Sequence, residues 1–211
     1  MVLPREVFAR GAVEVAPTLL GCVIEHQTPD GLVAVVLTEV EAYHGEADPA
    51  SHAYRGRTTR NAVMYGPPGH AYVYFTYGMH FCVNLVCLPD GIASAVLLRA
   101  GRVVDGLALA AARRASGRQV PERDLARGPA RLCKALGITR ALDGADVCDP
   151  ASPLRVRWPD RRVAVDISRG PRIGISAATE VPWRFWLTGD RTVSVYRPHA
   201  PRLRRKPVSA Q

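Results

Sequence analysis

Two glutamates, Glu39 and Glu41, stand two positions apart at the end of an apolar run. Residues two apart in an extended strand point to the same side, so both carboxylates should share the side of Val33, Val35 and Leu37. An apolar row that ends in two carboxylates indicates a strand that leaves the core and opens into a site. One of them could serve there as the general base for a water molecule. The alternative is an exposed strand face with solvated carboxylates.

A metal site is a third interpretation of these carboxylates. A metal-dependent nuclease would use Glu39, Glu41 and Asp48 as ligands. His44 and His52 follow in the sequence, but no HxxxH motif and no Cys/His ligand cluster accompanies them. We therefore predict that the chain holds no metal.

An aromatic set flanks the two carboxylates in the sequence: Tyr43, His52, Tyr72, Tyr74 and Tyr77. Each of these side chains could simply pack in a core. Together, in a basic chain, they are typical of a pocket that holds a nucleobase by stacking, which contributes roughly 1–3 kcal/mol per base. The set predicts a base-binding pocket near the carboxylates.

Two polar residues extend this prediction. Asn84 could read a base edge by hydrogen bonding, or it could tie down a loop. Arg99 lies in the apolar segment AVLLRA, and an unpaired buried charge is very costly, so it needs a carboxylate or phosphate partner. Glu41 is a plausible partner for Arg99.

Residues 71–84, AYVYFTYGMHFCVN, consist of two β-branched and aromatic runs around Tyr77, Gly78 and Met79. This pattern predicts a β-hairpin with a three-residue loop. One face is then dry and the other aromatic and polar. The dry face holds Val73, Phe75, Phe81 and Val83, and the other holds Tyr72, Tyr74, Thr76, His80, Cys82 and Asn84. A two-residue loop would scramble this sorting, since a slip of one residue reverses every side chain. A large aromatic at the tip needs cover, and we predict that Tyr77 enters DNA.

The chain has 211 residues, which suits one domain, and we expect it to span residues 1–200 with a flexible basic tail at 201–211. No apolar run is long enough to span a membrane, and the N-terminus lacks a signal pattern. The five cysteines are scattered and form no CxxC pair, which favours reduced thiols. We expect a cytoplasmic monomer.

The formal net charge of +9 and the pI of about 9.8 indicate a polyanion partner, because neutralising phosphates releases counterions. Of the 28 basic residues, only Lys134 and Lys206 are lysines. Arginine does not give up its proton and cannot be an amine nucleophile. Schiff-base chemistry therefore has almost no candidate residues.

The remaining pattern predicts an α+β fold, a single domain with a mostly antiparallel, curved β-sheet, surrounding helices and a protruding hairpin. Strands are expected at residues 22–26, 32–42 and 95–100, and helices at 106–114 and in GPARLCKAL. VAVDIS, RIGIS, RFWL and TVSVYR should be strands late in the chain. Residues 44–68 should form a long functional loop. Three of its residues, Arg55, Arg57 and Arg60, could meet phosphates.

The run LTEVEAYHGEADPASHAYRGRTTRNAVMYGPPGHAYVYFTYGMHFCVN closely resembles the alkyladenine (3-methyladenine) DNA glycosylase family. AVLLRA, GPARLCKALGI, RIGIS and PWRFW match as well, so the resemblance spans roughly residues 5–195. It implies base excision repair of double-stranded DNA that contains damaged purines, by base flipping and without strand cleavage. It implies no metal and no organic cofactor.

The resemblance also implies roles for residues of this chain. Glu41 would activate the water, and Arg99 would help to hold that water and the nearby phosphate. Tyr77 would fill the gap left in the duplex. The base pocket would consist of Tyr43, His52, Tyr74, Asn84, Ile173 and Gly174. The alternative function is a non-catalytic protein that binds damaged or distorted DNA.

Overall fold

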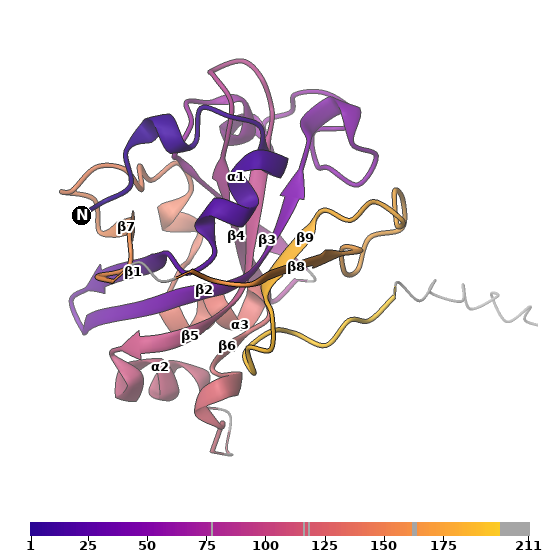
Figure 1. Cartoon of the computed structure of the whole chain (residues 1–211). Helices are drawn as coiled ribbons and strands as arrows, with labels where there is room; N and C mark the ends of the chain where they lie inside the picture. The colour runs from indigo at the N-terminus through magenta and orange to yellow at the C-terminus, as the bar shows by residue number, and fades with distance from the viewer. Residues whose placement is uncertain (77, 116, 118, 162–163, 199–211) are drawn as a thin grey trace, which may run out of the picture.

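An open antiparallel β-sheet organises the part of the chain that the structure describes (Figure 1). The structure is a computed structural model, and it describes residues 1–76, 78–115, 117, 119–161 and 164–198. Within these ranges the chain forms one domain with nine strands and three α-helices. The predicted α+β class is confirmed. The proposed basic tail at 201–211 lies outside the described residues.

The main path of the sheet runs β3-β4-β5-β2-β1-β7, with β6 paired to β5 and the β8–β9 pair joined to β2. The strands are β1 (Val23–Thr28), β2 (Gly31–Tyr43), β3 (Ala71–Thr76), β4 (His80–Val86), β5 (Ala95–Asp105), β6 (Ala126–Arg127), β7 (Leu154–Arg157), β8 (Ile167–Gly170) and β9 (Arg184–Leu187). The helices are α1 (Ala12–Leu19), α2 (Leu107–Arg114) and α3 (Pro129–Leu136). Among the described residues, no helix is long and apolar enough to cross a membrane.

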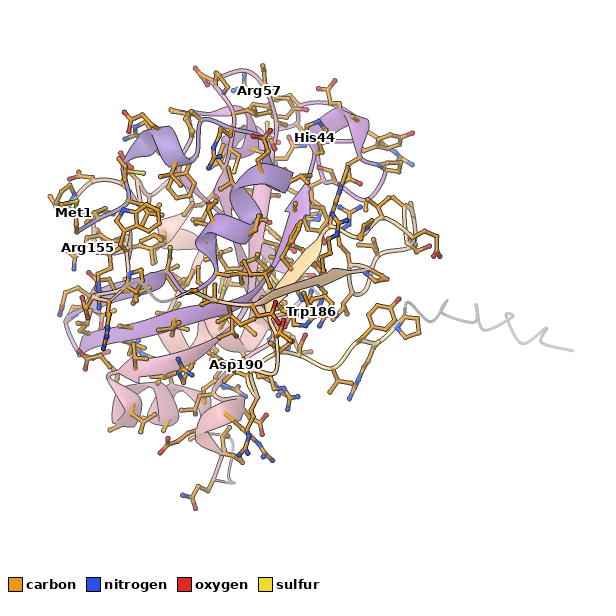
Figure 2. All side chains as sticks on the ribbon, viewed as in Figure 1. Met1, His44, Arg57, Arg155, Trp186 and Asp190 are labelled. Carbon is orange, nitrogen blue, oxygen red and sulfur yellow. The ribbon has the colours of Figure 1, made fainter. Side chains whose placement is uncertain are left out.

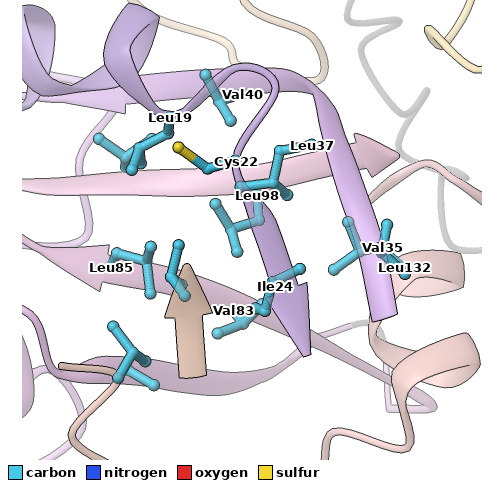
Figure 3. Packing of buried hydrophobic residues seen from close by; sticks show 14 of the residues in the cluster. Leu19, Cys22, Ile24, Val35, Leu37, Val40, Val83, Leu85, Leu98 and Leu132 are labelled. Carbon is cyan, nitrogen blue, oxygen red and sulfur yellow. The ribbon is translucent and has the colours of Figure 1, made fainter. Parts of the chain in front are cut away.

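The hydrophobic core joins α1 and α3 to the sheet (Figure 3). Leu19 of α1, Leu98 of β5 and Leu132 of α3 are fully buried members of one cluster. The sequence sets the ends of α3: Pro129 suits the first helical turn, and Gly137 takes the left-handed conformation that closes a helix, with φ of 73°. The core thus fixes the strands that carry the predicted site.

Strand β2 does not follow simple alternation along its whole length. Its core members are Val33, Val35, Leu37, Val40 and Ala42, so the alternation shifts by one after Leu37. At this point the register of β2 against β5 is irregular: Leu37 pairs with Gly101, and Val40 pairs with Leu98. A β-bulge of this kind re-aims the side chains that follow it.

The prediction that Glu39 and Glu41 share a face with the apolar row of β2 is therefore wrong. The bulge returns Val40 to the core and turns both carboxylates to the opposite side of the sheet. The register also passes over Arg99 of β5, whose side chain bonds to both carboxylates. The irregular pairing thus brings the three charged groups together.

The hairpin register is the predicted one. Strand β3 pairs with β4 so that Thr76 lies opposite His80 and Tyr72 opposite Asn84, which leaves three residues for the loop. Val73 and Val83 are fully buried, as expected of the dry face. The dry face ends before the tip, since Phe75 is 46% exposed, with its ring centroid 5.1 Å from that of Phe81. Tyr77 lies outside the described residues, so its entry into DNA stays a prediction.

Several strands predicted late in the chain differ from the observed ones. RFWL is β9, but β8 begins only at Ile167 and so overlaps little with VAVDIS. RIGIS and TVSVYR form no strand, and one backbone N–H in each donates to a carboxylate of β2. Glu41 accepts the Ile173 N–H, and Glu39 accepts the Ser194 N–H. Strand β7 was not predicted, although its sequence, LRVR, alternates apolar residues with arginine, which is a strand pattern.

Candidate active site

A cavity of about 440 Å³ lies where β2, the hairpin and the 173–176 segment meet. It is lined by Tyr43, Pro49, Ala50, His52, Met64, Tyr72, Tyr74, Thr76, Cys82, Asn84, Leu97, Arg99, Pro129, Ile173, Gly174, Ile175 and Ser176. The six residues predicted for a base pocket are all in this set, as is Arg99. The structure thus brings together residues up to 131 positions apart in the sequence.

The aromatic face of the hairpin forms one wall of the cavity. The rings of Tyr72 and Tyr74 stack with their centroids 5.5 Å apart, and His52 meets Tyr74 edge-on at 4.5 Å. Burial, followed by the neighbouring Cys82 thiol, raises the pKa of Tyr74 well above its ordinary value. Tyr74 is therefore a neutral, flat surface at any physiological pH. Asn84 is buried and donates to the Tyr72 carbonyl at 3.3 Å.

His52 reaches the cavity from the long loop, and the loop holds it in place. Asn61 donates from Nδ2 to the His52 carbonyl at 2.9 Å, and the His52 Nδ1 bonds to the Tyr72 hydroxyl at 3.1 Å. Desolvation of the ring, and then the charge of Arg60, lower the pKa of His52 below its ordinary value of 6.5.

The Glu41 carboxylate lies directly behind the cavity wall, with no exposed surface. Its Oε1 accepts the Ile173 N–H at 2.7 Å. Its Oε2 accepts the Tyr43 hydroxyl at 2.9 Å and Arg99 Nη1 at 3.3 Å. All three donors belong to residues that line the cavity. The carboxylate is thus held in a fixed orientation, and only the side chains and backbone that line the cavity separate it from the space where a ligand would sit.

Glu39 has a different environment. Its carboxylate accepts Arg99 Nε at 3.0 Å and Arg184 Nε at 2.7 Å, and it also accepts the N–H and hydroxyl of Ser194. Burial opposes ionisation, yet the Arg99 and Arg184 charges, assisted by Ser194, lower the pKa of Glu39 below its ordinary value. Glu39 does not line the cavity. These contacts make it a structural anion that anchors Arg99, β9 and the segment after β9.

The arrangement of acidic groups argues against the nuclease interpretation. Asp48 forms a two-point ion pair with Arg172, and Glu39 pairs with two arginines. In the described part of the chain, no group of three His, Cys, Asp or Glu side chains is arranged to hold a metal ion. The acidic groups here therefore face guanidinium partners and leave no carboxylate cluster for a cation.

One known protein family matches nearly the whole part of the chain that forms the site and the strands around it. The family model of methylpurine-DNA glycosylase (MPG) matches residues 6–191, which include every residue predicted for the site. The chain belongs to the methylpurine-DNA glycosylase family. Membership assigns it to the DNA glycosylases, hydrolases that act on DNA in repair.

Bacterial relatives of this chain agree with the family match over nearly their full length. A protein of Streptomyces avermitilis is 56% identical over 205 residues, which cover 96% of this chain and 95% of the relative. One of Leifsonia xyli is 55% identical, with 92% of each chain covered, and one of Mycobacterium bovis is 49% identical, with 91% and 93% covered. Each is named "Putative 3-methyladenine DNA glycosylase".

Sequence reasoning missed one feature of the glycosylase site, the buried ion pair of Arg172 with Asp48. The Arg172 side chain is fully buried, and its Nε is a buried donor with no partner among the described residues. Such a donor costs about 1–3 kcal/mol, so the remaining contacts of Arg172 must offset that cost. The signal was available: an arginine in the apolar segment PRIGIS needs a buried acidic partner, as Arg99 does.

The arginines predicted to meet phosphates lie on the surface of the long loop. Arg55, Arg57 and Arg60 are all exposed, and Arg57 is at the outer edge of the molecule in Figure 2. The loop is not structureless, since it contains short 3₁₀ helices at Gly45–Ala47 and Ala62–Tyr65. Contact with DNA phosphates stays a prediction for these residues.

Proposed function

We propose that this member of the methylpurine-DNA glycosylase family excises alkylated or deaminated purines, of the 3-methyladenine, hypoxanthine and ethenoadenine class, from double-stranded DNA. One observation carries the proposal. A cavity with an aromatic wall lies next to a buried carboxylate, Glu41, whose three donors all come from the cavity lining.

The cavity suits a flipped purine in size and in character. Its volume of about 440 Å³ falls in the range of roughly 300–1,000 Å³ that is usual for small-molecule sites. An enzyme that acts on a glycosidic bond inside a duplex must extrude the nucleotide, at a cost of a few kcal/mol. Stacking of the base between Tyr43 on one side and His52 and Tyr74 on the other offsets part of this cost.

The proposed chemistry is hydrolysis with Glu41 as general base. The bond from C1′ to the base breaks through an oxocarbenium-like transition state, and the electron pair leaves with the base. Water forms the new bond to C1′ and gives its proton to Glu41. Arg99 holds the water and the nearby phosphate. The Tyr43 hydroxyl, which donates to Oε2, orients the carboxylate for this step.

Tyr77 is proposed to fill the space that the flipped nucleotide leaves in the duplex. In the sequence it follows Thr76, which ends β3, and the pairing of Thr76 with His80 leaves three positions between the two strands. An aromatic side chain inserted there would replace the lost stacking and keep the base in the cavity.

The proposed enzyme is monofunctional and leaves the DNA strand intact. A lyase step needs an amine nucleophile at the site. Lys134 lies on the exposed side of α3 and does not line the cavity, and the other lysine, Lys206, lies outside the described residues. We further propose a monomer in the cytoplasm: every residue assigned to the base pocket lies in this chain's own cavity, and the described cysteines are thiols, as is usual in a reducing compartment.

Labelled duplexes that contain hypoxanthine, 1,N6-ethenoadenine or 3-methyladenine test the proposal. After incubation with the protein, half of each sample is treated with alkali to cut abasic sites. We expect strand breaks only after alkali. Binding without base release from any of the three duplexes would favour the non-catalytic alternative. Strand scission before alkali that EDTA prevents would indicate a nuclease.

A further inference from the structure

Arg172 lies beside the proposed base pocket and does not line it. Its side chain has no exposed surface. The guanidinium carbon is 4.6 Å from the ring centroid of Tyr43 and 5.2 Å from that of Trp183, so the group contacts both aromatic rings. Cation–π contacts of this kind strengthen when the cation is desolvated.

The same guanidinium also bonds to the backbone and to the long loop. Nη1 donates at 3.0 Å to the carbonyl of Ala42, which is the residue between Glu41 and Tyr43. Nη1 and Nη2 donate to the two oxygens of Asp48, in the long loop. Burial opposes ionisation of Asp48, yet the hydrogen bonds from Arg172 lower the pKa of its carboxyl below the ordinary value. The pair is therefore charged on both sides, and its planar fork restricts the position of Arg172.

Both ends of the Glu41 carboxylate depend on neighbours of Arg172. The nearer donor to Oε2, at 2.9 Å, is the hydroxyl of Tyr43, whose ring Arg172 contacts; Arg99 Nη1 also donates to Oε2, at 3.3 Å. The donor to Oε1 is the N–H of Ile173, the next residue in the chain. Arg172 itself does not touch the carboxylate. Its contacts nevertheless restrain two of the three groups that hold that carboxylate, one at each oxygen.

We propose that Arg172, held by Asp48, is a positioning residue for Glu41: through Tyr43 and the Ile173 N–H it orients the carboxylate toward the water and C1′. This inference rests on the proposed function. A general base must lie within hydrogen-bond reach of the proton that it removes, and a misplacement of about 1 Å can lower the rate by about 10²-fold. The alternative is a purely structural role, in which the Arg172–Asp48 ion pair only holds the long loop to the sheet.

Two variants separate the alternatives, Arg172→Lys and Asp48→Asn. The single-turnover rate of base release is measured on a hypoxanthine duplex, and Kd is measured on a duplex with a tetrahydrofuran abasic analogue. We expect each variant to lower the rate by roughly 10–100-fold while Kd changes by less than about threefold. Arg113→Lys is the matched control. Arg113 donates to the Ala135 and Leu136 carbonyls, away from the cavity, so this variant should lower stability and leave the rate unchanged.

A double-mutant cycle with Tyr43→Phe measures the coupling between Arg172 and Tyr43 in the rate of base release. An ion pair that only holds the loop would show no such coupling. Tyr43→Phe keeps the ring and removes the nearer donor to Oε2. If Arg172 acts through Tyr43, Arg172→Lys should cost markedly less in the Tyr43→Phe background than in the wild type.

Additive losses in this cycle, or parallel changes in rate and Kd, would overturn the positioning role. If Arg172→Lys does not fold, Asp48→Asn gives the same cycle, and loss of folding in both variants would make the pair a structural clamp. If the wild-type protein releases no base from any duplex, the proposed function itself fails before any variant is made.

Discussion

The division of labour between the two glutamates predicts a large stability loss for Glu39→Gln. Glu39 has no exposed surface and is the only acidic partner of Arg184 among the ion pairs of the described residues. Replacing it with glutamine leaves Arg184 without a carboxylate and turns one acceptor oxygen into an NH₂ group that faces donors. Breaking a buried pair in this way costs about 3–5 kcal/mol.

That magnitude is a large share of the roughly 5–15 kcal/mol that stabilises a typical protein. For a chain of this length, 1 kcal/mol shifts Tm by about 2–4 °C, so the variant should melt about 6–20 °C below the wild type. The matched variant Glu41→Gln should lose less, because Arg99 keeps Glu39 as its partner. Calorimetry and urea unfolding of both variants measure the difference.

The pH dependence gives an independent check on Glu39. Its pKa is lower in the folded state, so its contribution is present above its ordinary value of 4.5 and is lost as the pH falls below it. Glu39→Gln should remove part of the wild-type stability loss below about pH 4.5. A Glu39→Gln variant as stable as the wild type, or less destabilised than Glu41→Gln, would refute this account of the network.

Two further predictions concern the framework. Burial, and then the charge of Arg113, lower the pKa of His26 against an opposing hydrogen bond to Leu136, so stability should be complete above pH 6.5 and fall below it. His26→Gln should flatten that slope in urea titrations, and an unchanged slope would contradict the assignment. Gly45 and Gly56 both have positive φ, but a Cβ at Gly45 would lie 2.0 Å from the Ala93 carbonyl oxygen, whereas Gly56 has nothing within 4 Å. Gly45→Ala should therefore destabilise well beyond the roughly 1 kcal/mol of backbone strain expected for Gly56→Ala, and equal losses would contradict the steric argument.

Local patterns predicted part of the fold correctly. The hairpin register followed from the sorting of aromatic and polar residues around three loop positions, because a wrong register would have reversed every side chain. Helix α3 followed from Pro129 and Gly137, whose backbone preferences act at the ends of the helix. These signals are short-range and do not depend on distant partners.

Long-range features were not predictable in the same way. The bulge after Leu37 arises from the pairing of β2 with β5, which local alternation does not reveal. RIGIS and TVSVYR have strand-like sequences but lie outside the observed strands, and the Ile173 and Ser194 N–H groups donate to Glu41 and Glu39. For the site, residue types and the family resemblance indicated seven of the residues that line the cavity, namely Tyr43, His52, Tyr74, Asn84, Arg99, Ile173 and Gly174. The support that Arg172 gives to Tyr43 depends on contacts between segments about 130 positions apart, which only the structure displays.

The measurement that tests the central claim most directly compares Glu41→Gln with the wild type on one duplex that the wild type processes. Single-turnover base release and Kd for the abasic analogue are measured together, with the exposed Glu122→Gln as a control for the substitution. Loss of a general base predicts a rate lower by about 10²–10⁴-fold with Kd little changed. A Glu41→Gln variant that releases the base at the wild-type rate would contradict the account.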